Sequence, residues 1–430
     1  MTPSRLLFVC ALFLGLSGAK AADLPPPVGD DDFRSYPKAQ IELGQKLFYD
    51  RVLSGTYRVS CATCHNHDRA SSNGVRIDGK EDAEPDSLAF NGLPVYDALK
   101  PSSRHAPPLF NLGWKGVKAL FHDGRISMDD GKINTPAGGE LPKGVRDLLA
   151  AQALFPAVTS DELVGSVESD VQAVAHLGNE AVWNALSKRV IDLPDYWPLF
   201  QKAWPELSSP DQITISEIVN AIGAFVASEW RADDAPFDRY LKGDRVALTA
   251  DQISGMKLFY GPAQCSTCHS GIFHTDQNYH FVPLGFWRFD QPVEERSADI
   301  QRSRAALTGR ADDVLKIRTP SLRNVAKTAP YGHAGSIANL EDVLEQHVNA
   351  NAALADLTAQ IGASSAMQAD QKSALQAKVD AAAQGAVAYP RLTEKDKELL
   401  IAFLESLTDE NSLAGQLGKP EDVPSSLALD

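Results

Sequence analysis

The sequence predicts a mainly α-helical fold in which two similar units meet at an interface. Three observations predict it. A five-residue pattern occurs twice, each copy follows a segment with the character of a short amphipathic helix, and the chain of 430 residues is too long for a single hydrophobic core. We expect one unit in residues 23–240 and the other in residues 241–430.

Residues 1–22 have the pattern of a cleaved secretory signal. Arg5 precedes the apolar run LLFVCALFLGL, and small residues follow, ending in Ala19-Lys20-Ala21. The alternative is an uncleaved membrane anchor, but this run is too short to span a bilayer comfortably. No later stretch is long and apolar enough for a membrane helix. The sequence therefore predicts export to the periplasm and no membrane span.

The overall charge restricts the possible partners. The formal net charge is −15 at pH 7. A chain this acidic is a poor binder of nucleic acid and is repelled by anionic lipid. The charge therefore excludes a nucleic-acid function and suits a basic protein partner.

The cysteines define the two copies of the pattern. Of five cysteines, Cys10 lies in the signal segment, and the other four form two C-x-x-C-H units, Cys61-Ala62-Thr63-Cys64-His65 and Cys265-Ser266-Thr267-Cys268-His269. This pattern is typical of covalent haem c attachment: two thiols on one turn reach the haem vinyl groups, and the histidine binds the iron. A zinc site is the alternative, but its four ligands would have to come from neighbouring segments. We predict two covalently bound haems with His65 and His269 as iron ligands.

The segments around the motifs support an internal duplication. LGQKLFYD, residues 43–50, precedes the first motif, and GMKLFYG, residues 255–261, precedes the second. Residues 394–407 predict a closing helix, because apolar residues recur at helical spacing and Thr393 is a good N-cap. We expect residues 163–240 to be mainly helical and residues 350–387 to form a helical insertion. The Pro-, Asp- and Ser-rich stretches 24–36 and 410–430 are expected to be loose.

Ordered sequence blocks then give a family resemblance over most of residues 40–408. The blocks are LGQKLFYDRVLSGTYRVSCATCH, RHAPPLFNLGW, FHDGR, QALFPAVTSDELVG, the second haem motif and RTPSLRNVAKTAPYGHAGS. The chain resembles the bacterial dihaem cytochrome c peroxidase family, which includes the MauG-like enzymes. The resemblance implies two cytochrome c-like haem domains around an interface. It also implies reduction of hydrogen peroxide at the N-terminal haem, with electrons passed by the C-terminal haem from a small c-type cytochrome or cupredoxin.

The resemblance also implies a catalytic carboxylate above the His65 haem. The family places this glutamate ten residues after a glutamine, and Gln152 and Glu162 match that spacing. A carboxylate there can move a proton between the two oxygens of bound peroxide. The alternative interpretation of Glu162 is a surface carboxylate at a helix start, after Thr159-Ser160-Asp161. Glu140 is the second candidate for the catalytic role.

The sixth ligand of the second haem departs from both family patterns. Fourteen residues after the histidine of the PY-x-H block, His333, the peroxidases have methionine and the MauG-like enzymes have tyrosine, whereas this chain has His347. A nitrogen ligand lowers a haem potential relative to a thioether. Met256 and Met367 are the alternative ligands.

A calcium ion between the domains is a further implication of the resemblance. The matching positions are Asn111, Thr328 and Pro330, which offer one side-chain and two backbone oxygens. Ordinary turn residues are the alternative interpretation.

Four further histidines complete the comparison with the family. His122 stands where the family usually has the tryptophan of W-D-G-R between the haems, and Trp114 is a nearby substitute or a packing residue. His105 is the only local candidate for a displaceable distal histidine, but its spacing does not match, so the first haem is expected to be open. His274 and His280 are interpreted as packing residues or haem propionate contacts.

Two other functions remain open on the sequence. A MauG-like enzyme would use peroxide to oxidise side chains of a partner protein, and the nitrogen ligand at position 347 favours this alternative over the methionine form. A non-enzymatic dihaem electron carrier would have two six-coordinate irons, and Gln152 with Glu162 argues against it.

Overall fold

The structure is a computed structural model that describes residues 23–73, 89–90, 93–94, 105–159, 162–164, 169–282, 304–363, 368–383 and 390–429. The predicted signal segment and Met367 lie outside the described residues. Within the described ranges, no helix is both long and apolar enough to cross a bilayer. The fold is mainly α-helical, as predicted, with a few short strands.

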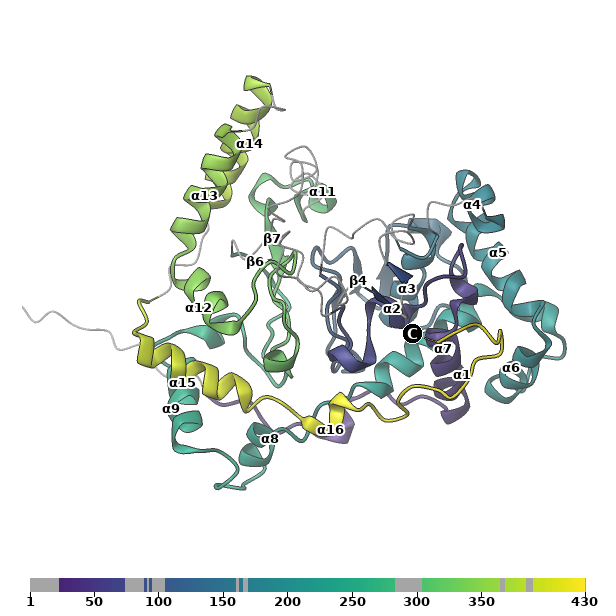
Figure 1. Ribbon diagram of the computed structural model, residues 1–430, viewed down its shortest axis with the longest axis horizontal. Coiled ribbons are helices and arrows are strands. Elements are labelled where there is room, and N and C mark those ends of the chain that lie inside the picture. Colours follow the sequence, from purple (N-terminus) through teal and green to yellow (C-terminus); the bar gives the residue numbers. More distant parts are fainter. Residues whose placement is uncertain are drawn as a thin grey trace, which may run out of the picture.

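The described helices and strands follow the order shown in Figure 1. The helices are α1 Lys38–Tyr49, α2 Cys61–Cys64, α3 Leu148–Ala153, α4 Asp170–Val174, α5 Asn179–Ile191, α6 Trp197–Ala203, α7 Ile215–Glu229, α8 Pro236–Leu241, α9 Ala250–Phe259, α11 Arg304–Thr308, α12 Leu340–Val348, α13 Ala350–Ala363, α14 Ala369–Ala383, α15 Glu394–Glu405 and α16 Glu410–Leu413. The strands pair antiparallel, β1 Ala89–Phe90 with β2 Leu93–Pro94, β3 Ala119–Leu120 with β4 Ile126–Asp129 and β5 Lys132–Asn134, and β6 Tyr279–Phe281 with β7 Lys316–Arg318.

A first hydrophobic core forms where α1 crosses α7. The α7 sequence ISEIVNAIGAFVASE is apolar on nearly all sides, so this helix is buried along most of its length. Thr214 and Glu217 form a capping box that starts it. Gly44 of α1 lies directly on the Ala221 carbonyl of α7 and leaves no room for a side chain, which lets the two backbones approach closely.

A second core repeats this construction with α9 and α15. Gly255 of α9 lies on the Leu399 carbonyl of α15, again without room for a side chain, and Phe259 and Phe403 pack beside the contact. The closing helix predicted at residues 394–407 is confirmed as Glu394–Glu405, with Thr393 accepting the Asp396 N–H. The predicted insertion after His347 is confirmed as helical by α13 and α14, which project from the rest of the molecule in Figure 1.

Two asparagines show how closely the halves repeat each other. Asn111 and Asn324 both have positive φ, 59° and 57°, a conformation that asparagine tolerates better than most residues. The Asn111 N–H donates to the Trp230 carbonyl, just after α7, and the Asn324 N–H donates to the Leu407 carbonyl, just after α15. In each half, the loop that follows the C-x-x-C-H motif is therefore hydrogen-bonded to the end of a long helix, α7 in the first half and α15 in the second.

The expectation that residues 24–36 and 410–430 are loose is wrong for the described part of these stretches. Phe33 is buried against Phe273, and the segment after α16 crosses back onto the first half, as Figure 1 shows. The buried Glu229 carboxylate accepts the N–H groups of Leu417 and Gly418 at 2.9 and 2.8 Å. Polar composition suggested loose ends, but these bonds and buried rings hold both segments in place.

Candidate functional site

The first C-x-x-C-H motif forms one helical turn, α2, with His65 at its end. Ser60 and Thr63 form a capping box around this turn. The His65 Nδ1–H donates to the Ser71 carbonyl at 3.1 Å, and burial lowers the pKa of His65. The ring is therefore neutral with its basic nitrogen at Nε2, the tautomer that a metal-binding imidazole needs.

The second motif repeats this arrangement. Cys265 begins a 3-10 turn, Cys265–Thr267, and the His269 Nδ1–H donates to the His274 carbonyl at 3.0 Å. Burial, followed by the nearby His347 ring, lowers the pKa of His269 to about 4. None of the four motif cysteines forms a disulfide among the residues that the structure describes. Two thiols beside one anchored imidazole are the donor set that a covalently bound haem requires, so both motifs fit this cofactor.

His347 lies in the last turn of α12, close to the second motif. Its Nδ1–H donates to the Val343 carbonyl at 2.7 Å, and burial lowers its pKa. Leu340 and Leu344 of α12 pack in the second core together with Cys265, so the helix that carries His347 lies against the second motif. Met256, the alternative ligand, is buried among the apolar side chains of the second core, on α9. The structure thus brings His347 to the motif and assigns Met256 a packing position.

The predicted catalytic residues lie on α3 and on the following loop. Gln152 and Glu162 are both partly exposed. The Gly55 N–H donates to the Leu163 carbonyl at 2.6 Å, which joins the loop carrying Glu162 to the segment just before the first motif. Glu140, the second candidate, is exposed in the turn Gly138–Glu140.

Arg189 of α5 holds the same pre-motif segment, and the sequence analysis did not identify it. Its buried guanidinium donates to the carbonyls of Val52 at 3.2 Å, Gly55 at 3.1 Å and Ser54, and it pairs with Asp170. These bonds satisfy a charge that would otherwise be costly to bury. Since the partners are backbone carbonyls distant in sequence, no motif could reveal this role.

The segment that carries His105 lies behind His65, on its Nδ1 side. The Leu109 N–H donates to the Ser71 hydroxyl at 2.9 Å, and the Pro107 carbonyl is a further hydrogen-bond partner of the His65 ring. His105 therefore lies on the segment that is hydrogen-bonded to Ser71, the residue whose carbonyl accepts the His65 Nδ1–H.

The contact between the halves brings together the HDGR and PYGH blocks. The rings of His122 and His333 lie 4.5 Å apart between centroids, and the Arg318 N–H donates to the His122 carbonyl at 2.7 Å. Trp114 instead packs edge-on against Phe273, near the second motif, with centroids 5.4 Å apart. The two candidates for the family's tryptophan thus occupy different places in the interface.

The side chain of Asn111, one of the residues expected to bind calcium, is hydrogen-bonded within the fold. Asn111 Oδ1 accepts the Ala232 N–H at 2.7 Å, and Asn111 Nδ2 donates to the Ala232 carbonyl at 2.8 Å. Asn324 makes equivalent bonds with the Asp409 N–H and the Ser412 hydroxyl, each at 2.8 Å. The Asn111 amide is therefore part of the framework that the two halves share. A calcium ion requires about six to eight oxygen ligands.

An imidazole lies close to Pro330, one of the expected calcium ligands. Gly335 packs against both His105 and Pro330. The backbone N–H of His105 donates to the backbone carbonyl of His333 at 3.1 Å. Both ring nitrogens of His105 are buried without a hydrogen-bond partner among the described residues. Burial, with a smaller effect of His65, lowers the pKa of His105 to about 4. A neutral nitrogen donor is poorly suited to calcium, so this imidazole would not add a ligand to the implied calcium site.

Calcium removal is therefore expected to leave the protein unchanged. After treatment with EGTA and gel filtration, the unfolding temperature and the rate of peroxide-dependent cytochrome oxidation should equal those of untreated protein. The reason is that the Asn111 amide is already committed to Ala232. A rate that falls in EGTA and recovers with calcium, but not with magnesium, would contradict this expectation.

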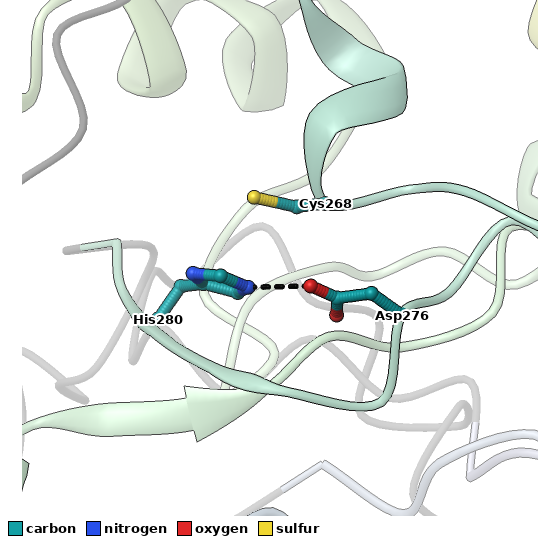
Figure 2. A group of neighbouring side chains, drawn as sticks. All are labelled: Cys268, Asp276 and His280. Carbon is teal, nitrogen blue, oxygen red and sulfur yellow. Dashed lines mark hydrogen bonds and ion pairs between the residues drawn. The ribbon is translucent and has the colours of Figure 1, made fainter.

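A third group of polar side chains lies beside the second motif, and Figure 2 shows it. The Cys268 Sγ, an Asp276 carboxylate oxygen and a His280 ring nitrogen all lie within 4.8 Å of one another. The His280 Nε2 and the Asp276 Oδ2 are 2.8 Å apart. His274, in contrast, is fully buried among the rings of the second core, where its Nε2 meets the Tyr260 hydroxyl at 3.0 Å. Sequence analysis identified His280 but not its partner Asp276, although their spacing of four residues was a usable signal.

The structure contains two duplicated helical units, and each presents a C-x-x-C-H segment with an anchored imidazole. This arrangement is typical of a dihaem protein. The family profile described as di-haem cytochrome c peroxidase matches residues 38–246. The cytochrome c551 peroxidase of Pseudomonas aeruginosa is 30% identical over 328 residues, which cover 76% of this chain and 77% of the relative. The chain belongs to the di-haem cytochrome c peroxidase family.

Further similarities extend to the MauG branch of this family. The methylamine utilization protein MauG of Methylorubrum extorquens is 29% identical over 319 residues, covering 73% of this chain and 71% of MauG. The crystal structure of a MauG-like protein associated with microbial copper homeostasis superposes with a TM-score of 0.57 at 27% identity, covering 92% of this chain and 96% of that one. The family implies two haem groups and an oxidoreductase.

Proposed function

We propose that this protein is a dihaem c-type peroxidase that reduces hydrogen peroxide with electrons from a small redox protein. Membership of the peroxidase family supports the reaction. The observation that carries the proposal is a further imidazole at the second motif: α12, which carries His347, packs Leu340 and Leu344 in the same core as Cys265.

The first motif is proposed as the peroxide site. When bound, a haem attached to Cys61 and Cys64 would supply the iron that peroxide oxidises. His65 would hold that iron through Nε2, because its Nδ1–H is committed to the Ser71 carbonyl. We assign Glu162 the transfer of a proton from the inner to the outer peroxide oxygen. Gln152 would orient the peroxide, and Gly55 supports the loop that carries Glu162.

The second motif is proposed as the electron-transfer site. Cys265 and Cys268 would attach its haem, and His269 and His347 would both bind its iron. Both imidazoles donate Nδ1–H to backbone carbonyls, which orients Nε2 for a metal. We propose that residues 23–240 and 241–430 are the two haem domains, that residues 1–22 are a cleaved signal, and that the protein acts in the periplasm. The acidic surface charge suits a basic donor such as a small c-type cytochrome; a cupredoxin is the other donor class.

A MauG-like reaction is the second candidate. The nitrogen ligand proposed at position 347 favours it, because such a ligand lowers the haem potential and stabilises oxidised iron. The protein would then use peroxide to oxidise side chains of a partner protein. The similarity to MauG supports this candidate.

One experiment separates these functions. Electron paramagnetic resonance of the ferric protein should show one high-spin and one low-spin haem, and peroxide with reduced cytochrome should then give rapid turnover. A long-lived oxidised state without turnover would favour the MauG-like reaction. Two low-spin signals that do not respond to peroxide would mean a non-enzymatic electron carrier and would overturn the proposal.

A further inference from the structure

An acid and an imidazole lie beside the sulfur that would join the second haem. Figure 2 shows Cys268 next to the hydrogen-bonded pair of Asp276 and His280, and the ligand atoms of all three lie within 4.8 Å of one another. The Asp276 N–H donates to the Cys268 carbonyl at 2.9 Å, so the acid is fastened to the motif itself. The inference that follows rests on the proposed haem attachment at Cys268.

The Asp276 carboxylate is held in place and charged. It accepts the Asn278 N–H at 2.9 Å and the Asn278 Nδ2–H at 3.2 Å, besides the bond with His280. Burial alone would raise the pKa of Asp276, but the hydrogen bonds from His280, Asn278 and Thr319 outweigh it and lower the pKa. The side chain is 13% exposed, so solvent screens the negative charge only partly.

A fixed negative charge next to Cys268 would affect the reduction potential of a haem that is attached there. The ferric haem carries one more positive charge than the ferrous haem, so a nearby anion stabilises the ferric form. His280 donates a hydrogen bond to the same carboxylate and thereby offsets part of its charge. The two residues therefore act in opposite directions, with the carboxylate the stronger partner because it is ionised.

The first motif has no such group among the described residues. Its nearest acid in sequence, Asp68, has a side chain that is 70% exposed and pairs with Lys419 at 2.6 Å. Solvent and the lysine neutralise most of the effect of that charge. The acid–imidazole pair therefore distinguishes the second motif from the first.

We infer that the Asp276–His280 pair sets the reduction potential of the haem on Cys268, with Asp276 lowering it and His280 moderating that effect. Neither residue touches substrate, so both act as positioning residues through the haem. Together with His347, the Asp276–His280 pair makes the second haem easier to oxidise than the first. The second haem then supplies the electron that the first site consumes. The same three side chains could hold a metal ion only if Cys268 were not joined to haem.

Spectroelectrochemical titration of the full-length protein, with the two haems followed separately, tests this inference. Asp276→Asn keeps the shape and removes the charge. The second haem should shift to a more positive potential, with about a tenfold larger ferrous-to-ferric ratio at the wild-type midpoint. The first haem should not move. Asp68→Asn is the matched control and should shift neither haem.

A second variant keeps the inference testable if Asp276→Asn folds poorly. His280→Phe removes the hydrogen bond and leaves the carboxylate charge unmoderated, so the second haem should shift to a more negative potential. An unchanged second potential in a folded Asp276→Asn or His280→Phe protein would overturn the inference, as would equal shifts of both haems. Absence of bound haem from the wild-type protein, with a metal ion retained at Cys268, would instead refute the proposed haem attachment.

Discussion

Glu162→Gln is expected to slow peroxide reduction by about a thousandfold while both haems stay attached and their ferric spectra stay unchanged. The amide has nearly the same size as the carboxylate but cannot take up and return the proton that must move between the peroxide oxygens. The rate of peroxide-dependent oxidation of reduced cytochrome under stopped flow measures the effect.

Glu140→Gln is the matched control, since it makes the same chemical change at an exposed position. It should retain the wild-type rate. If the Glu140 variant lost activity and the Glu162 variant kept it, the proton-transfer role would belong to Glu140. If both kept it, neither carboxylate would be the catalytic group.

His347→Ala is expected to convert the second haem completely from low-spin to high-spin iron. The helix that carries the imidazole packs in the same core as Cys265, and Met256, the alternative ligand among the described residues, is enclosed by the packing of α9 against α15. The low-spin signal in electron paramagnetic resonance should disappear, and cytochrome oxidation should slow because the haem loses its fixed low-spin geometry.

His176→Ala serves as the control for this variant, because His176 is exposed and lies in the turn Ala175–Leu177 of the first half. It should leave both spin states unchanged. A low-spin signal that persists in His347→Ala would show that another group binds the iron and would remove position 347 from the proposed mechanism.

The two variants also separate the proposed roles of the two motifs. Loss of Glu162 should affect the reaction with peroxide and leave the second haem's potential unchanged. Loss of His347 should alter the second haem's spectrum and potential before any effect on peroxide binding. The reversed pattern would mean that the assignment of peroxide site and electron-transfer site is inverted.

The sequence alone determined the features whose chemistry is contiguous in the chain. Two C-x-x-C-H segments, the helix that begins after Thr393 and the repeat of residues 43–50 in residues 255–261 could all be predicted, because each depends on residues within a few positions of one another. The order of the sequence blocks also predicted the family to which the chain belongs.

Only the tertiary structure decided what the isolated polar residues do. Asn111 was predicted to hold calcium, but its amide bonds to Ala232, a residue far along the chain. The ends of the chain read as loose from their composition, yet Glu229 and Phe273 hold them. The spacing of Asp276 and His280 was a signal in the sequence, but only the fold placed the pair beside Cys268. A hydrogen-bonding group bonds to the partner that the fold brings within about 3 Å, and the packing of α1 on α7 and of α9 on α15 determines that partner. Two cysteines and a histidine on one turn, in contrast, lie side by side because they are neighbours in the sequence.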